Sequence, residues 1–458
     1  MYTSLPIPSG IFKSYDIRGL YPEEITTHAV AQIARAFVTM LRAENGQDTL
    51  RIAVGGDMRV STPELKGAVI EALVAHGVEV IDIGLVSTPT YYFAVANYGF
   101  DGGVQVSASH NPKQYNGLKM VRRAAAPIGK GNGMEEVERL AATDLTWVGA
   151  SGSVTTQEHI LEDLITAEVD PSDRAAIRPM KIVVDAANAM GALDVEAILK
   201  DMPVELIRLN FSLDGTFPVH QPDPLDPKNL EVLHNAVLAH HADLGIAPDG
   251  DGDRYFFVDE NGEVVRQEIL RGIMAQIALR ETPGATVCYD IRPGKITKDL
   301  IEEAGGTAIV TRVGHSHIKK AMIEAGAIFG GESSGHYFYK FPFGTFEAPA
   351  TLVTKFLRWV SEQGEPLSEA VAPYRSKYSN SGEINSEVPD VVAVLEKIQE
   401  RYSDGEISLL DGVTITYPEY WFNVRGSNTE PLIRLNLEAT SKEKMEEQRD
   451  EVLRLIRE

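Results

Sequence analysis

A strand-like segment followed by a helical one recurs along this sequence. Three apolar, β-branched segments show it best: RIAVGGDMR at 51–59, KIVVDAANAMG at 181–191 and ATVCYDIRPG at 285–294. Each has an Asp near its end, and an amphipathic pattern of about 10 to 15 residues follows. Apolar strands that alternate with helices form largely parallel sheets covered on both faces, so the pattern predicts an α/β protein. Such sheets bind ligands beyond the carboxyl ends of their strands, which makes the loops after the strands the candidate site.

The first of these units also carries a predicted helix start. Ser61-Thr62-Pro63-Glu64 has the spacing of a capping box with proline in the first turn. The helix is expected to run to Gly77, and VEVIDIG at 78–84 is expected to form the next strand.

The last part of the chain has a different pattern. GVTITY (412–417), YWFNV (420–424) and LIRLNL (432–437) read as strands, and a final helix is expected to be capped by Thr440 and Glu443. Strands that precede a terminal helix indicate a smaller α+β domain.

Domain boundaries are predicted from length and from polar or turn-rich segments. At about 150 residues per domain, 458 residues require three or more domains. Polar, small-residue stretches lie near 149–157 and 371–382, and the turn DENGE lies at 259–263. We therefore predict three similar α/β domains and a smaller C-terminal α+β domain, with boundaries at 1–152, 153–259, 260–371 and 372–458.

Charge and cysteine content exclude several classes of protein. The chain has 43 Lys and Arg against 66 Asp and Glu, a net charge of −23, which argues against a nucleic-acid or anionic-membrane partner. The single cysteine, Cys288, excludes an internal disulfide. No stretch approaches the roughly 20 apolar residues of a membrane span, and the first residues lack the pattern of a signal peptide. These features predict a cytoplasmic protein.

The segment PDGDGDR (248–254) is the strongest candidate site. Asp249, Asp251 and Asp253 alternate with glycines after an apolar strand. Two carboxylates about 4 Å apart repel by roughly 4 kcal/mol at an effective dielectric constant near 20, and a divalent cation removes that repulsion. All-oxygen ligands on a short loop suit Mg²⁺.

Two other interpretations of this loop are less favoured by the sequence. A calcium EF-hand needs Gly at position 6, where this sequence has Arg254, and the following YFFV is expected to form a strand rather than the second half of a calcium loop. A solvated acidic turn is disfavoured, because alternation of this kind is rare by chance. The magnesium loop is the preferred interpretation.

Two further loops carry small and polar residues. GGESSGH (330–336) offers Glu332, Ser334 and His336 beside glycines and suits the recognition of hydroxyl groups. RGSNTEP (425–431) offers a compact set of donors suited to phosphate. Taken alone, each is at least as well explained as an ordinary turn.

The segment SASHNP (107–112) makes Ser109 a candidate nucleophile. A hydrolase triad is disfavoured because there is no G-x-S-x-G elbow, and adjacency of Ser109 and His110 does not supply the geometry of a base. A phosphoserine opposite Mg²⁺ is the better interpretation, since phosphoryl transfer needs mainly positioning and charge neutralisation.

Together, these four segments resemble those of the α-D-phosphohexomutases, in particular the phosphomannomutase/phosphoglucomutase group. The order is that of the family: SASHNP, DGDGDR, GESSGH and RGSNTEP. The resemblance runs nearly end to end. It implies four domains around a central cleft and interconversion of hexose 1-phosphate and 6-phosphate through a 1,6-bisphosphate, which also serves as activator.

The resemblance assigns roles to individual residues. Ser109 is the phosphorylated residue and, with Asp249, Asp251 and Asp253, holds one Mg²⁺ per chain. The transfer site is lined by His110, Asn111, Lys119 and Arg254, and the acid/base candidates are Lys119 and His336. To act as a base, Lys119 needs a lowered pKa, which Arg254 and Mg²⁺ would favour. Its alternative role is to hold the phosphoryl group by charge. The remaining substrate contacts are Tyr15, Arg18, Gly314, His315, Glu332 and Ser334 for the sugar and Arg425, Ser427, Asn428 and Thr429 for the phosphate that is not transferred.

Some positions favour the mannose/glucose branch, and others depart from it. FKSYDIRG (12–19) matches that branch, whereas phosphoglucosamine mutases typically read FGTDGIRG. Ser333 stands where Met or Gln is common, FGTFEAPA (343–350) replaces an acidic Asp-Gly run, and either Arg292 or Lys295 takes the basic phosphate-contacting role.

We therefore predict a phosphohexomutase acting on mannose or glucose phosphates, monomeric or homodimeric. Its C-terminal domain is expected to hinge near Pro373 and close on the substrate. The alternatives are a phosphoglucosamine mutase, a Mg²⁺-dependent phosphomonoesterase and a non-catalytic binding protein.

Overall fold

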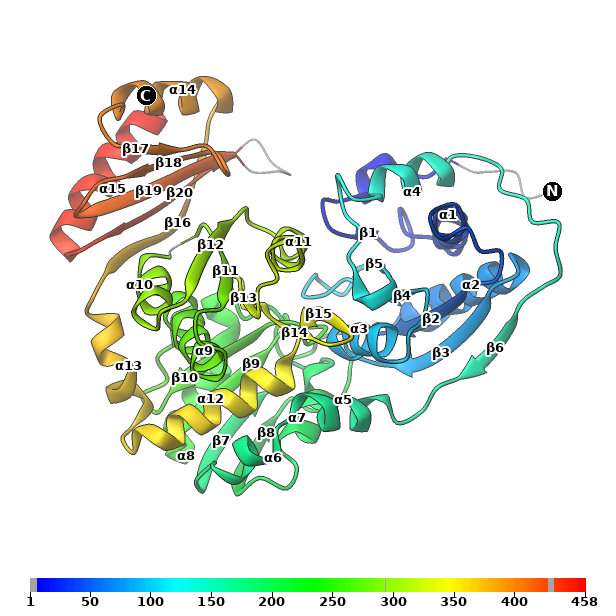
Figure 1. Ribbon diagram of the computed structural model, residues 1–458, viewed down its shortest axis with the longest axis horizontal. Helices are drawn as coiled ribbons and strands as arrows, with labels where there is room; N and C mark the ends of the chain where they lie inside the picture. Colours follow the sequence, from blue (N-terminus) through cyan, green and yellow to red (C-terminus); the bar gives the residue numbers. More distant parts are fainter. Residues whose placement is uncertain (1–5, 293, 427–431) are drawn as a thin grey trace. The chain divides into compact units, whose positions relative to one another are not determined.

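The computed structural model describes residues 6–292, 294–426 and 432–458 (Figure 1). It divides into two compact units. Unit 1 comprises 1–264 and 334–367, and unit 2 comprises 265–333 and 368–458. None of the helices in the described ranges is long and apolar enough to cross a membrane.

The first sheet of unit 1 is mixed and has the strand order β1-β5-β4-β2-β3-β6. Strands β2, β3, β4 and β6 pair in parallel, whereas β5 runs antiparallel to β1 and β4. The strands are β1 (Ile17–Leu20), β2 (Arg51–Gly56), β3 (Glu79–Leu85), β4 (Gly102–Val106), β5 (Tyr115–Arg122) and β6 (Ser153–Thr156). The helices are α1 (Thr27–Asn45), α2 (Thr62–Ala75), α3 (Thr88–Asn97) and α4 (Met134–Ala141).

Two adjacent glycines of β4 show that helices pack closely against both faces of this sheet. A Cβ on Gly102 would meet Phe37 and Leu41 of α1, whereas a Cβ on Gly103 would meet Tyr91 of α3. Because neighbouring residues of a strand point to opposite faces, α1 and α3 lie on opposite sides of β4. Only small residues allow both helices to approach the strand this closely.

The second sheet of unit 1 has the order β10-β9-β7-β8, with only β10 antiparallel. Its strands are β7 (Met180–Asp185), β8 (Val204–Leu209), β9 (Leu244–Pro248) and β10 (Tyr255–Asp259), and its helices are α5 (Ile160–Glu168), α6 (Pro171–Ala175), α7 (Gly191–Leu199) and α8 (Glu231–His240). The β14 (Tyr337–Phe341) and β15 (Gly344–Glu347) hairpin and helix α12 (Pro349–Gln363) complete unit 1.

Unit 2 contains a parallel sheet and an antiparallel one. Strand β11 (Thr286–Asp290) lies between β12 (Thr307–Thr311) and β13 (Phe329–Gly331), with helices α9 (Gln267–Glu281), α10 (Lys295–Glu303) and α11 (His315–Ala325). The C-terminal sheet has the order β16-β20-β19-β18-β17 and is antiparallel throughout. Its strands are β16 (Ser379–Glu387), β17 (Glu406–Ser408), β18 (Val413–Thr416), β19 (Tyr420–Gly426) and β20 (Leu432–Ala439), and its helices α14 (Val391–Arg401) and α15 (Lys442–Arg457) cover one face (Figure 1).

The predicted fold class is confirmed, and two expected helix caps are wrong. Helix α2 starts where expected, but Ser61 does not cap it, because its hydroxyl accepts a hydrogen bond from Nδ2 of Asn116 at 2.8 Å. Helix α15 is capped by Ser441, whose side chain accepts from the Lys444 amide, and not by Thr440. The polar stretch 371–382 contains the end of helix α13 (Leu367–Arg375), with Pro373 inside it, and the start of β16.

Candidate active site

Ser109 lies in the loop that leaves the carboxyl end of β4. The residue is only 1% exposed, and its backbone is left-handed, with a φ of 51°. The hydroxyl of Ser107 accepts the Ser109 amide at 3.0 Å, and the Asn111 amide donates to the carbonyl of Ala108 at 3.0 Å. These two contacts turn the chain so that Ser109 faces the second sheet of unit 1.

The three aspartates follow β9, again at the carboxyl end of a parallel strand. Asp249, Asp251 and Asp253 are buried, and each offers an oxygen within 4.8 Å of the others. Oδ1 of Asp249 accepts the amides of Asp253 at 3.1 Å and Arg254 at 3.3 Å, which closes the loop on itself. The next residues form β10, which confirms that this loop is not an EF-hand.

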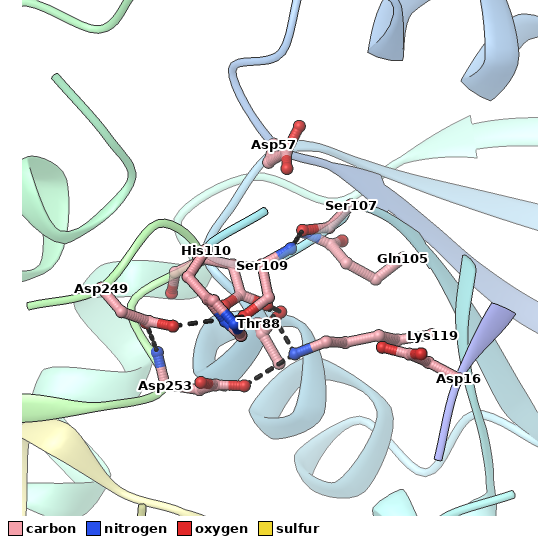
Figure 2. Close-up of polar contacts among 12 residues, drawn as sticks. Asp16, Asp57, Thr88, Gln105, Ser107, Ser109, His110, Lys119, Asp249 and Asp253 are labelled. Atoms are coloured by element: carbon pink, nitrogen blue, oxygen red, sulfur yellow. Dashed lines mark hydrogen bonds and ion pairs between the residues drawn. The ribbon is translucent and has the colours of Figure 1, made fainter. Parts of the chain in front are cut away.

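The two loops meet at the Ser109 hydroxyl (Figure 2). Oγ of Ser109 donates to Oδ2 of Asp249 at 3.2 Å and lies 3.1 Å from Nδ1 of His110. A Cβ on Gly250 would come within 2.4 Å of the Ser109 carbonyl oxygen. The glycine after Asp249 is therefore required by the close approach of the two loops.

Lys119 extends from β5 into the aspartate cluster. Its Nζ lies 2.6 Å from Oδ2 of Asp251 and 2.7 Å from Oδ2 of Asp253. Burial lowers the pKa of Lys119, but the two carboxylates outweigh it and raise the pKa above its usual value. The geometry therefore holds Lys119 as an ammonium ion, contrary to the lowered pKa expected of a base.

The donor set fits Mg²⁺. Oδ1 of Asp251 is buried and has no hydrogen-bond partner among the described residues, which is costly unless a cation approaches. Burial and then Asp253 and Asp251 raise the pKa of Asp249 well above its usual value, a repulsion that a divalent ion would relieve. Three carboxylates without nitrogen or sulfur ligands match the preference of Mg²⁺.

His336 and Arg254 lie near Oδ1 of Asp253, whereas Lys119 binds Oδ2. Nε2 of His336 is 3.1 Å from Oδ1 of Asp253 and 3.3 Å from Nε of Arg254, and Nδ1 is 2.9 Å from the Ser334 hydroxyl. Ser334 therefore orients the His336 ring from the side away from the aspartates.

His110 and Arg18 complete the part of the site in unit 1. Burial, followed by the charges of Arg254 and Arg18, lowers the pKa of His110 well below its usual value, so the imidazole is neutral at pH 7. Nη1 of Arg18 donates to Oδ1 of Asn111 at 2.6 Å, which joins two of the predicted substrate contacts, and Tyr15 is half-buried.

Comparison with known proteins identifies the family. The phosphoglucomutase/phosphomannomutase family matches the chain in all of its domains: α/β/α domain I at residues 9–146, domain II at 158–262, domain III at 268–378 and the C-terminal domain at 383–455. The chain belongs to the phosphoglucomutase/phosphomannomutase family.

Individual relatives cover almost the whole chain. It is 38% identical to the phosphohexose mutases of Xanthomonas campestris over 93% of this chain and 94% of theirs. It is 37% identical to the phosphomannomutase of Methanocaldococcus jannaschii over 97% of both chains. The crystal structure of a phosphoglucomutase/phosphomannomutase family protein from Burkholderia thailandensis matches with a TM-score of 0.88 and 31% identity, covering 98% of both chains.

Unit 2 of this phosphoglucomutase/phosphomannomutase chain carries the remaining predicted residues. Glu332 lies 3.1 Å from Nη2 of Arg292, and Arg425 donates to Glu383 at 2.6 Å. Gly314 precedes α11 with φ 130°, and His315 begins that helix. Ser427, Asn428 and Thr429 lie outside the described residues.

Two residues that support the site in unit 1 were not predicted from the sequence. Thr88, at the start of α3, donates its hydroxyl to Oδ2 of Asp251 at 2.5 Å and its amide to the Asp251 carbonyl at 2.9 Å. Arg59, after β2, contacts the Ser109 loop from behind. The Asp-x-Arg at the end of β2 was a signal for Arg59, because it stands at the carboxyl end of a central strand.

Proposed function

We propose that this protein interconverts the 1-phosphate and 6-phosphate of mannose or glucose through a phosphorylated Ser109 and a hexose 1,6-bisphosphate. The observation that carries the proposal is the Ser109 hydroxyl, which faces Asp249 at 3.2 Å inside a buried cluster of carboxylates that Lys119 bridges. The names of the relatives, phosphohexose mutases and phosphomannomutase, support the same activity.

The transfer breaks the bond between phosphorus and Oγ of phosphorylated Ser109 and forms a bond to the free hydroxyl of the hexose monophosphate. The hydroxyl proton passes to a base, for which His336 is the better candidate, because Lys119 is held as an ammonium ion. Lys119 and Arg254 offset the charge on the phosphoryl group during the transfer. The bisphosphate then reverses, and its other phosphoryl group returns to Oγ of Ser109.

Asp249, Asp251 and Asp253, with a phosphoryl oxygen on Ser109, would hold one Mg²⁺. When bound, it neutralises charge on the phosphoryl group and lowers the barrier to its transfer. Hexose 1,6-bisphosphate is proposed as the activator, because it phosphorylates a Ser109 that has lost its phosphoryl group.

Sugar and distal phosphate are proposed to bind to residues of unit 2. Glu332 accepts hydrogen bonds from sugar hydroxyls, and Arg425 binds the phosphate that is not transferred. Arg292 is favoured over Lys295 as the second basic contact, because Arg292 pairs with Glu332 whereas Lys295 pairs with Asp299 at 3.2 Å.

A substrate panel followed by ³¹P NMR tests the proposal. Mannose, glucose and glucosamine phosphates are each supplied with Mg²⁺ and catalytic glucose 1,6-bisphosphate, with Ser109→Ala in parallel. Isomerisation of mannose or glucose phosphates that disappears in Ser109→Ala is expected. Turnover of glucosamine phosphate alone would indicate a phosphoglucosamine mutase, and release of inorganic phosphate without an isomer would indicate a phosphomonoesterase.

A further inference from the structure

The guanidinium of Arg59 is fully buried beneath the Ser109 loop. Its Nη2 donates to the carbonyls of Ser109 at 2.7 Å and Asn111 at 2.6 Å, and its Nη1 donates to those of Pro112 at 2.9 Å and Tyr115 at 3.1 Å. The side chain has no exposed surface. A single planar group therefore binds four carbonyls of one seven-residue segment.

Asp57 fixes the orientation of that guanidinium. Its Oδ2 accepts from Nε of Arg59 at 3.2 Å, and its Oδ1 accepts from the Arg59 amide at 3.0 Å and from the Thr62 hydroxyl at 2.7 Å. Since arginine has five N–H donors, the carboxylate and the four carbonyls satisfy all of them. Lysine, with three donors on a flexible stem, cannot reproduce this set.

A loop from the second sheet of unit 1 holds Arg59 from the other side. A Cβ on Gly215 would come within 2.6 Å of the Arg59 Cα, and the ring of Phe217 lies 5.2 Å from the guanidinium carbon. Nε2 of Gln221 donates to the carbonyl of His110 at 2.9 Å. The same loop thus contacts both the anchor and the segment that the anchor holds.

Ser109 needs such an anchor. Its left-handed backbone is unfavourable for a residue with a side chain. Its carbonyl oxygen also lies so close to Gly250 that a Cβ at position 250 would be only 2.4 Å away. The Asn111 side chain that contacts Arg18 belongs to the same held segment.

We infer that Arg59 is a positioning residue for phosphoryl transfer: it fixes the backbone of 109–115 so that Oγ of Ser109 faces Asp249. The inference rests on the proposed function for its catalytic consequence. Its structural consequence, a rigid Ser109 loop, can be measured without any substrate.

The test compares Arg59→Lys with Lys355→Met. Arg59→Lys keeps the positive charge but loses the planar guanidinium and its five N–H donors. The control removes another mostly buried cation of unit 1, which pairs with Asp173 of α6 at 3.0 Å. Because a displacement of about 1 Å costs roughly 100-fold in rate, Arg59→Lys is expected to lower kcat about 100-fold. Its KM for hexose phosphate is expected to change less than about threefold, because Arg59 holds Ser109 and, of the predicted substrate contacts, only Asn111. Lys355→Met is expected to keep the wild-type kcat.

Hydrogen exchange of the 107–116 peptide provides the second readout. Arg59→Lys is expected to speed exchange at these amides at least tenfold, with no change in the amides of β3. Asp57→Asn, which leaves the guanidinium in place but weakens its anchor, is expected to give an intermediate result, and it serves as the test variant if Arg59→Lys fails to fold.

The outcomes separate this inference from the proposed function. A wild-type enzyme that isomerises hexose phosphates, with a variant that retains kcat and slow exchange, overturns the inference alone. Faster exchange in a chain whose wild type does not isomerise any hexose phosphate overturns the proposed function and leaves Arg59 as the anchor of the loop. A proportional rise in KM with unchanged kcat overturns the positioning role.

Discussion

Lys119 is the residue on which the charge balance of the site depends. Among the described residues of unit 1 it is the one buried lysine, and its Nζ bridges Asp251 and Asp253 within 2.7 Å. A buried ammonium between two carboxylates is stabilised by them and is in place to offset charge on a transferred phosphoryl group.

Lys119→Met is expected to lower kcat by about 10²- to 10³-fold, because it removes a charge that stabilises the transition state. Mg²⁺ should bind no more weakly, since the variant loses a cation that competes for the same carboxylates. Steady-state kinetics and calorimetric Mg²⁺ titration check the two expectations. Lys66→Met, which removes a lysine paired with Asp82, is the control, and equal kcat values for the two variants would contradict the role of Lys119.

At the scale of elements, the site depends on how closely two loops approach each other. Gly250, in the loop after β9, lies against the Ser109 carbonyl in the loop after β4. Its φ is not in the left-handed region, so the need for glycine here is steric. The close approach of Ser109 to the aspartates therefore depends on the absence of a side chain at position 250.

Gly250→Ala is expected to lower kcat roughly 100-fold. Its Cβ would lie 2.4 Å from the Ser109 carbonyl oxygen, so the two loops must move apart by about 1 Å. The matched control is Gly67→Ala in α2, where an added Cβ meets nothing within 4 Å. That control should stabilise the protein by about 0.5–1 kcal/mol without changing kcat. Kinetics and thermal unfolding of both variants give the answer, and full activity in Gly250→Ala would refute the steric argument.

A second contact between elements makes the stability of unit 2 depend on pH. Glu438 on β20 accepts the Trp421 indole N–H at 2.8 Å and the Lys295 amide of α10 at 3.0 Å. Burial, opposed by these hydrogen bonds and reinforced by Glu268, raises the pKa of Glu438 to about 7. The folded state then retains a proton that the unfolded chain releases above pH 4.5, so the contribution of Glu438 to stability falls between pH 4.5 and 7.

Glu438→Gln abolishes this loss, because the amide stays neutral and its oxygen still accepts both hydrogen bonds. The variant should match the wild type near pH 4 and exceed its stability by up to about 3 kcal/mol at pH 8. Urea unfolding, followed by fluorescence of Trp421 with the other two tryptophans replaced by phenylalanine, measures the difference. Glu406→Gln, at an exposed position of β17, is the control. A stability difference that does not change with pH would rule out the explanation.

At the scale of the whole molecule, the proposed cation ligands all belong to unit 1. Mg²⁺ at 100 times its Kd should therefore stabilise unit 1 by about 2.7 kcal/mol against unfolding. Hydrogen exchange with and without Mg²⁺ should show slower exchange in β9 and β10 and no change in β19 and β20. Equal protection of both units would contradict the assignment of the cation to Asp249, Asp251 and Asp253.

The predictability of each feature follows from the range of the contacts that determine it. The strand and helix alternation, the cluster of aspartates and Ser109 were predicted, because each depends on residues close in sequence. The cap at Ser61 was mispredicted because its hydroxyl binds Asn116, 55 residues away. Arg59 was missed for the same reason: its partners lie 50 to 56 residues further along the chain, and only the folded sheet brings them together.

The most direct test of the whole account is a single turnover of protein carrying ³²P on Ser109. The labelled protein is mixed with Mg²⁺ and unlabelled mannose 1-phosphate, and the products are separated after milliseconds to seconds. The account predicts that label moves from the protein into hexose bisphosphate and then hexose 6-phosphate. Label that stays on the protein, or appears as inorganic phosphate, would contradict it.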